Sequence, residues 1–108
     1  MIVIEMNEGP KIPYDVSDTR VCLNDDLTIN LAARQKDWPV HIDVCKDTDG
    51  ALVIGTGSGV YYIAQFDIPE IQYVAPVDNE TPPEPLPLDM DTVTMSLWSL
   101  EVPAQIIE

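Results

Sequence analysis

The chain has 108 residues, of which 19 are acidic and five are basic, and its formal net charge is −14. A surface with this charge repels nucleic acid and anionic membranes, which argues against direct binding to either, and it attracts basic partners. The length fits one domain over residues 1–108, large enough to bury a core without metal or disulfide support. We therefore expect no cofactor.

The compartment is predicted from the first residues and the two cysteines. No apolar run approaches the roughly 18 residues of a membrane span. The segment Met1–Glu5 lacks the basic region of a secretion signal, which predicts residence in the reducing cytoplasm. Cys22 and Cys45 are therefore expected to be free thiols rather than a disulfide.

Alternation of apolar and polar residues dominates the first part of the chain. This period of two gives a strand one dry face and one wet face, and no stretch sustains the three- and four-residue spacing of a helix. Residues 2–6 form the first predicted strand, and prolines punctuate the loop at 7–19. Predicted strands at 21–23 and 27–31 then flank a turn at Asn24–Asp26.

The middle of the chain begins with a single predicted helical turn at 32–37, which Pro39 ends. A strand at 40–45 follows, and the turn Asp47–Gly50 leads into a strand at 51–54. An Asp-Gly pair between two apolar segments is the usual signal of a tight hairpin.

The last part of the chain is predicted from its glycines and prolines. Gly55–Gly59 predicts a hairpin connection to a strand at 60–66, since the helix and the lysine of a phosphate loop are both missing after the glycines. Residues 71–75 are expected to extend the sheet, and residues 76–91 to form a proline-rich acidic loop or arm. The strand at 92–101 is predicted to be the longest.

The strand pattern predicts the fold class. Seven or eight short strands with turn residues between them are typical of an all-β fold, namely an antiparallel β-sandwich or a small barrel. The last strand carries Trp98 and Leu100 on its second face, so its far end is predicted to be buried on both sides, with Trp98 in the core. The core is expected to be mostly aliphatic, because only seven residues are Phe, Trp or Tyr.

One group of residues has the chemistry of a metal or catalytic site. His41, Asp43 and Cys45 share one face of a predicted strand, and Cys22 could supply a fourth metal ligand. Neighbours on one strand face stand about 7 Å apart, which is too far to share an ion or to form a Cys–His dyad. His41 is the chain's one histidine, so there is no other candidate for the base of a His-based triad. We therefore predict a wet strand face with a half-buried thiol, no metal, no catalytic residue and no enzymatic activity.

A protein-interaction surface is predicted instead, from the proline-rich segment and from a short cationic segment on an otherwise acidic chain. Its residues are Pro82, Pro83, Pro85, Leu86, Pro87, Arg34, Lys36 and Trp38. The prolines make a semi-rigid arm that could embrace a neighbouring subunit. The cations give the molecule an electrical dipole that a contact between subunits would exploit.

These features predict a non-catalytic acidic β domain that acts by association with a protein partner or with itself. The expected setting is a structural or assembly component of a phage-like or other mobile element, in the cytoplasm or incorporated in a phage-like particle. One alternative is an acidic inhibitor or DNA mimic that occupies a basic nucleic-acid-binding site. A second alternative is a sugar-binding module, in which Trp38, Tyr14, Tyr61 and Tyr62 would stack on sugars.

Overall fold

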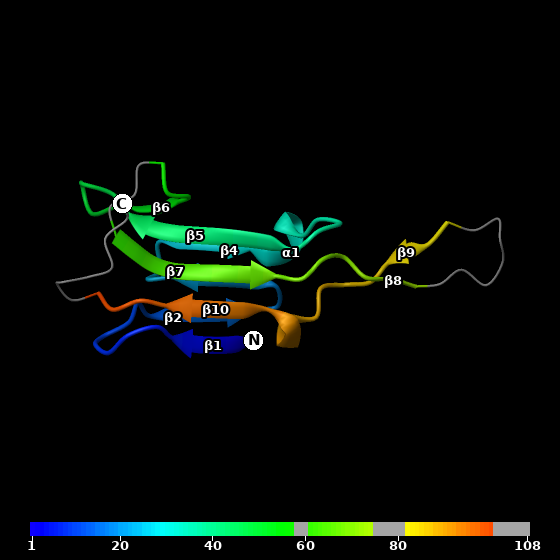
Figure 1. Ribbon diagram of the computed structural model, residues 1–108, viewed down its shortest axis with the longest axis horizontal. Helices are drawn as coiled ribbons and strands as arrows, with labels where there is room; N and C mark the ends of the chain where they lie inside the picture. The colour runs from blue at the N-terminus through cyan, green and yellow to red at the C-terminus, as the bar shows by residue number, and fades with distance from the viewer. Residues whose placement is uncertain (58–60, 75–81, 101–108) are drawn as a thin grey trace.

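The computed structural model of the protein describes residues 1–57, 61–74 and 82–100, and the chain in these ranges is nearly all β (Figure 1). A four-residue helix, α1 (Leu31–Arg34), and a 3-10 turn, η1 (Met90–Thr92), interrupt the strands. The ten strands of the described ranges are β1 (Ile2–Glu5), β2 (Tyr14–Ser17), β3 (Arg20–Leu23), β4 (Leu27–Asn30), β5 (Val40–Lys46), β6 (Leu52–Ile54), β7 (Tyr61–Ile68), β8 (Tyr73–Val74), β9 (Glu84–Pro85) and β10 (Thr94–Leu97).

The strands form three sheets. A five-stranded sheet has the order β1-β10-β7-β5-β6, and a three-stranded sheet of β2-β3-β4 lies behind it in Figure 1. Strands β8 and β9 form a separate two-stranded ribbon. All neighbouring strands run antiparallel except β1 and β10, which are parallel. The predicted all-β class is confirmed, in the form of a small sandwich with one parallel strand pair.

The hydrophobic core lies between the five-stranded and the three-stranded sheet. Phe66 is fully buried at the centre of the larger sheet, where it pairs with Ile42 on one side and with Met95 on the other. The smaller sheet contributes Val21 and Leu23, which are also fully buried. Alternate residues of the inner strands, such as Val21 and Leu23 of β3 and Ile42 and Val44 of β5, therefore face the core, as the period of two predicts.

Most of the predicted elements are confirmed with shifted boundaries, but one strand of the sandwich was missed. Strand β2 lies inside the segment predicted as a loop at 7–19. A two-residue turn joins β2 to β3, and its first residue, Asp18, has a φ of 53°. Aspartate adopts this left-handed conformation more readily than most residues, so the turn forms without the glycine that usually signals a hairpin.

The prediction that the last strand is the longest is wrong. β10 has four residues, whereas β7 has eight and runs to Ile68. The 3-10 turn η1 occupies the start of the predicted strand, and the Asp89 carboxylate caps it by accepting a hydrogen bond from the Asp91 amide at 3.0 Å. Beyond β10, the Ser99 amide donates to the Asn7 side chain at 2.7 Å, so the backbone has left the ladder.

The two glycine-containing turns behave as expected within the described residues. In the turn Asp47–Gly50, the Asp47 carboxylate accepts two backbone amide hydrogen bonds at 2.9 Å, and Gly50 has a φ of 80°. Gly55 leaves β6 with a φ of 93°, a conformation that glycine adopts at no steric cost. The remainder of the glycine run includes residues 58–60, which lie outside the described ranges.

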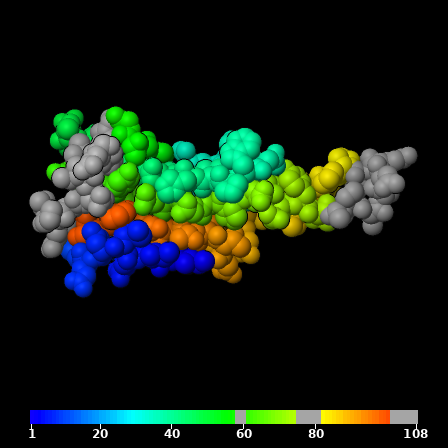
Figure 2. Space-filling model, in the orientation of Figure 1, coloured from blue at the N-terminus to red at the C-terminus, as the bar shows by residue number. Residues whose placement is uncertain are grey.

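The ribbon of β8 and β9 projects beyond the sandwich (Figures 1 and 2). The radius of gyration is 16.2 Å, above the roughly 13 Å expected of a compact domain of this length. We call residues 71–87 the hairpin arm, of which residues 75–81 lie outside the described ranges. The predicted extension of the sheet by residues 71–75 is wrong, because Pro69 ends β7 and the chain then leaves the sheet.

The predicted arm at 76–91 is too long at its far end. Leu88 and Met90 pack against the core cluster, so the chain has already rejoined the sandwich there. The described part of the returning arm is residues 82–87, all of them exposed. None of the helices in the described ranges is both long enough and apolar enough to cross a membrane.

Candidate functional site

Large apolar side chains that are exposed in groups are unfavourable in water and indicate where a protein surface contacts a partner. Apart from Ile54, those in the described ranges fall into two groups. The arm group consists of Trp38, Tyr73, Val74 and Leu86. The edge group consists of Ile2, Val3, Ile4, Met6, Tyr14 and Val16.

The base of the hairpin arm is fastened to the loop between α1 and β5. The Ile71 amide donates a hydrogen bond to the Lys36 carbonyl at 2.8 Å. The Gln35 side-chain amide donates to the Pro69 carbonyl at 3.0 Å. Two segments more than 30 residues apart in the sequence are therefore held together at the end of the sandwich from which the arm projects.

A side-chain contact strengthens the same junction. The Tyr73 hydroxyl of β8 donates a hydrogen bond to the Asp37 carboxylate. This hydrogen bond is the main reason that the pKa of Tyr73 is raised, because the carboxylate stabilises the protonated phenol. The arm therefore leaves the sandwich in a fixed direction, with Tyr73 still 47% exposed.

The cationic segment of the predicted interaction surface lies beside this junction. Lys36 accepts the hydrogen bond from the arm through its backbone, and its side chain is exposed. Trp38 is 62% exposed, the highest value among the large apolar residues that the structure describes. Arg34 ends α1 and is exposed. The structure thus joins Lys36 and Asp37 to the arm, and Arg34 and Trp38 lie close to them in the sequence.

The proline segment of the predicted surface lies on the returning strand of the arm. Pro82, Pro83 and Pro85 are exposed, and Pro85 pairs with Tyr73 in the ribbon. Leu86 is 44% exposed, and its amide donates to the Gln72 carbonyl at 2.7 Å. A cavity of about 300 Å³ lies at the arm base, where its lining residues are Leu86, Pro87, Leu88, Asp89, Gln35, Pro69, Glu70, Gln72 and Thr92.

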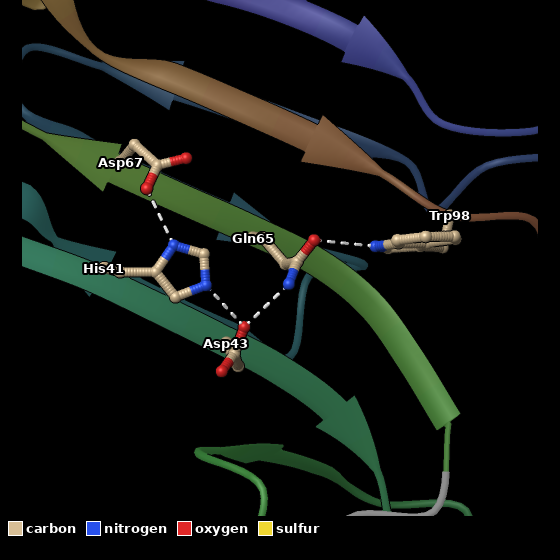
Figure 3. Close-up of polar contacts among 5 residues, drawn as sticks. All are labelled: His41, Asp43, Gln65, Asp67 and Trp98. Carbon is tan, nitrogen blue, oxygen red and sulfur yellow. Dashed lines mark hydrogen bonds and ion pairs between the residues drawn. The ribbon is translucent and has the colours of Figure 1, made fainter. Parts of the chain in front are cut away.

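A polar network occupies the outer face of the five-stranded sheet (Figure 3). His41 bonds to Asp67 through Nδ1 and to Asp43 through Nε2, both at 2.7 Å. Both ring nitrogens can donate to these carboxylates only when the ring is protonated. The hydrogen bond to Asp67 contributes most to raising the pKa of His41, and partial burial opposes it. The network therefore favours an imidazolium held between two aspartates.

The sequence-based view of this strand face needs two corrections. His41 and Asp43 do contact each other, because their side chains lean along the strand and span the distance between their Cα atoms. Cys45 is fully buried rather than half-buried, and burial raises the pKa of its thiol, with the charge of Asp43 adding to the effect. A buried thiol with a raised pKa is a poor nucleophile.

No metal site emerges from the same face. Within residues 1–57, 61–74 and 82–100, no group of three or more His, Cys, Asp or Glu side chains could hold an ion. The structure leaves Cys22 and Cys45 as free thiols. The carboxylates of Asp43 and Asp67 are instead engaged by His41.

The network continues to the tryptophan predicted to lie in the core. Gln65 donates to Asp43 and accepts a hydrogen bond from the Trp98 indole N–H, each at 2.9 Å. The indole stacks on Tyr62, with ring centroids 5.9 Å apart. Trp98 is only partly buried, so its predicted place in the core is wrong. One indole face and the N–H are already used, which leaves Trp98 a poor platform for a sugar.

We expect NMR to find the pKa of His41 above its ordinary value of 6.5, and the signal is unambiguous because the chain has one histidine. Asp67→Asn should lower this pKa more than Asp43→Asn, because the hydrogen bond to Asp67 contributes most. An unchanged pKa in both variants would show that the two carboxylates do not hold the ring.

The raised pKa of His41 also determines how its contribution to stability changes with pH. The folded protein binds this proton more tightly than the unfolded chain, so the stabilisation is full below about pH 6.5 and is lost as the pH rises through the folded-state pKa. His41→Gln should therefore destabilise the protein more at pH 6 than at pH 8. The site is half-exposed, so we expect less than about 1 kcal/mol.

Comparison with known proteins finds no match to this chain among protein-family models, curated proteins or solved structures. The fold and the surface therefore carry the functional argument. They define a small all-β sandwich with a projecting hairpin arm and two groups of exposed apolar residues.

Proposed function

We propose that this chain is a non-catalytic assembly module that associates with another protein chain through its hairpin arm. The setting that fits this role is a particle of a phage-like or other mobile element. The observation that carries the proposal is the arm group, a set of exposed apolar side chains on and beside a ribbon that has no core of its own.

The energetics of the ribbon support a role in association. A lone two-stranded hairpin is marginally stable in water, because it buries little apolar surface against the entropy of ordering its backbone. Tyr73, Val74 and Leu86 are 47%, 48% and 44% exposed. These three side chains are not part of the core of the sandwich. Their apolar surface is therefore free to be buried against a partner, which would stabilise the complex.

The charge of the arm indicates what it would contact. The arm and the residues at its base, 69–91, contain six acids and no lysine, arginine or histidine. Glu84 lies within the ribbon, and Glu70 and Asp89 flank its base. The complementary surface is therefore an apolar patch with a basic rim, since opposite charges around an interface steer and orient the encounter.

Site-specific photo-cross-linking in cells tests the proposal. A benzophenone amino acid replaces Tyr73 in one variant and Leu86 in another, and Ile54 is the control because it is 40% exposed and lies outside both apolar groups. We expect a discrete cross-linked protein band from positions 73 and 86 and none from position 54. Equal cross-linking from all three positions, or none from the arm, would contradict the proposal.

Shortening the arm gives the matching test of association and fold. Replacement of residues 73–86 with a short Gly-Ser linker should leave the circular dichroism spectrum unchanged and cost little stability, because loop entropy changes slowly with length. The same variant should no longer bind the cross-linked protein. If that protein still binds, the arm is not the contact.

A further inference from the structure

The second group of exposed apolar residues lies where both sheets of the sandwich end. Strand β1 forms the border of the five-stranded sheet and, within the described ranges, pairs on one side alone, with β10. Ile2 and Ile4 share a face with Thr94 and Ser96, away from the core, and are 51% and 44% exposed. No described strand therefore pairs with the outer backbone edge of β1, which apolar side chains flank.

Val3 is exposed on the opposite face of the same strand. It lies opposite Met95, which is fully buried, so Val3 faces the side on which the core lies. Nevertheless Val3 is 41% exposed. Strand β1 therefore presents apolar side chains to water on both of its faces.

The smaller sheet ends on the same side of the sandwich, with β2 behind the β10–β1 border in Figure 1. Tyr14 and Val16 lie opposite Leu23 and Val21, both fully buried, so they too point toward the interior. Both are nevertheless exposed. The part of the chain that the structure describes thus covers the interior of the sandwich only partly along this side.

The two borders of the five-stranded sheet differ in how they are protected. Sheet borders are commonly protected by short strands, prolines, lysines or bulges. At the other border, β6 has three residues, and Gly55 then turns the chain away with a φ of 93°. Strand β1 is also short, with four residues, but it contains no proline, lysine or bulge, and its one charged residue, Glu5, lies at its end.

We propose that β1 pairs antiparallel with β1 of a second copy, about a two-fold axis perpendicular to the sheet. Each copy contributes five strands, so one continuous sheet would cross the dimer. The inference stands on the strand geometry and does not depend on the hairpin arm. It adds a second interface to the one proposed above.

The geometry of β1 selects the register of this pairing. The two-fold axis keeps the interiors of both copies on the same side, so each residue must lie opposite one that faces the same way. A pairing centred on Val3 satisfies this condition. Val3 then lies opposite Val3 of the second copy, and Ile2 opposite Ile4, so apolar side chains meet on both faces.

The charge pattern favours a second copy over a basic peptide. Residues 1–7 contain one acid, Glu5, among the 19 in the chain, so β1 offers a basic strand almost nothing to pair with. In the register centred on Val3, the two Glu5 residues are about 14 Å apart along the strands. This distance exceeds the Debye length of about 8 Å at physiological salt, so their repulsion is screened.

The expected dimer responds to salt in an unusual direction. Each copy carries a net charge of −14, and their general repulsion opposes association. Added salt screens this repulsion and leaves the apolar strand contact intact, so dimerisation should strengthen as the salt concentration rises. An interface held by salt bridges would weaken instead.

Analytical ultracentrifugation of the full chain tests the inference. We expect the mass to rise from 12.0 kDa toward twice that value with protein concentration, and at lower concentration when sodium chloride is added. Val3→Lys places two like charges opposite each other and should raise the dimer Kd about tenfold or more. Ile54→Lys, at the other border of the sheet and similarly exposed, should leave the Kd unchanged.

A second variant keeps the test decisive if Val3→Lys does not fold. Val3→Cys should form a disulfide-linked dimer on mild oxidation, because residues directly opposite each other have Cβ atoms about 5 Å apart, whereas Ile54→Cys should not. A wild-type chain that stays monomeric at 0.5 M salt and about 0.5 mM protein, or a dimer that survives Val3→Lys, would overturn the inference. A dimer lost on shortening the arm but kept in Val3→Lys would belong to the arm.

Discussion

Phe66→Ala is expected to lower the free energy of unfolding by about 3–5 kcal/mol. Phe66 is the chain's one phenylalanine, it is fully buried, and it lies on the central strand of the five-stranded sheet. Its neighbours on the flanking strands are Ile42 and Met95, and it belongs to the core cluster that also contains Val21 and Leu23 of the smaller sheet, so loss of the ring leaves a cavity in that core. A typical domain is stable by about 5–15 kcal/mol, so the variant should be close to unfolding at 37 °C.

Urea unfolding followed by circular dichroism measures this effect. Phe66→Leu is the matched control, because it keeps most of the apolar volume and should cost about 1.5 kcal/mol or less. A loss below about 1 kcal/mol in Phe66→Ala would mean that the two sheets do not pack on this residue.

Trp98→Ala is expected to cost about 1–3 kcal/mol, less than the core variant. The loss combines the stacking on Tyr62, worth about 0.5–1.5 kcal/mol, with the hydrogen bond to Gln65, worth a similar amount. Trp98→Phe keeps an aromatic ring against Tyr62 and removes the N–H, so it should recover roughly half of the loss. The same urea unfolding experiment compares these variants.

A double-mutant cycle separates the two contributions of Trp98. Combined with Tyr62→Leu, Trp98→Ala should show a coupling energy of about 0.5–1.5 kcal/mol. Fluorescence in a Trp38→Phe background should report a partly shielded Trp98, because Trp38 is 62% exposed and would otherwise dominate quenching. A coupling energy of zero would show that the two rings are neighbours without a stabilising contact.

The core of the sandwich was predictable because successive residues of a strand face opposite sides, so apolar residues alternate with polar ones along the chain. The period of two in residues 27–31 and 40–45 places Ile29, Ile42 and Val44 on the buried faces, where the structure has them. Local sequence is sufficient here, since a strand with one dry face leaves its pattern in the chain itself.

The strand boundaries were less predictable, because they depend on contacts distant in sequence. Just beyond the end of β10, the Ser99 amide donates a hydrogen bond to the side chain of Asn7. The local sequence gives no sign of this contact, because the two residues are 92 positions apart. Strand β2 was missed because its turn uses Asp18 in place of glycine. Both errors arise where a specific side chain replaces the usual signal of a turn or a strand end.

The candidate site was predictable in its residues but not in its arrangement. The prolines of residues 82–87 and the cations near Trp38 are visible in the sequence, whereas Tyr73 appeared to belong to the main sheet. Tyr73 lies instead in the ribbon, where its hydroxyl donates a hydrogen bond to Asp37. This contact joins residues that are 36 positions apart in the sequence. The exposure of Val3 was equally hidden, because an apolar residue on a strand predicts burial unless the strand is known to lie at an edge.

The parallel pairing of β1 with β10 has a consequence for how the protein is made. Ile2 lies opposite Thr94, so 92 residues separate the two partners. At a synthesis rate of about 5–20 residues per second, β1 waits about 5–20 seconds on the ribosome before its partner strand exists. The β5–β6 hairpin and β7 can pair during that time, because each lies close in sequence to its neighbour. Strand β1 is therefore made well before its pairing partner, and its apolar residues stay accessible to chaperones until β10 has been translated.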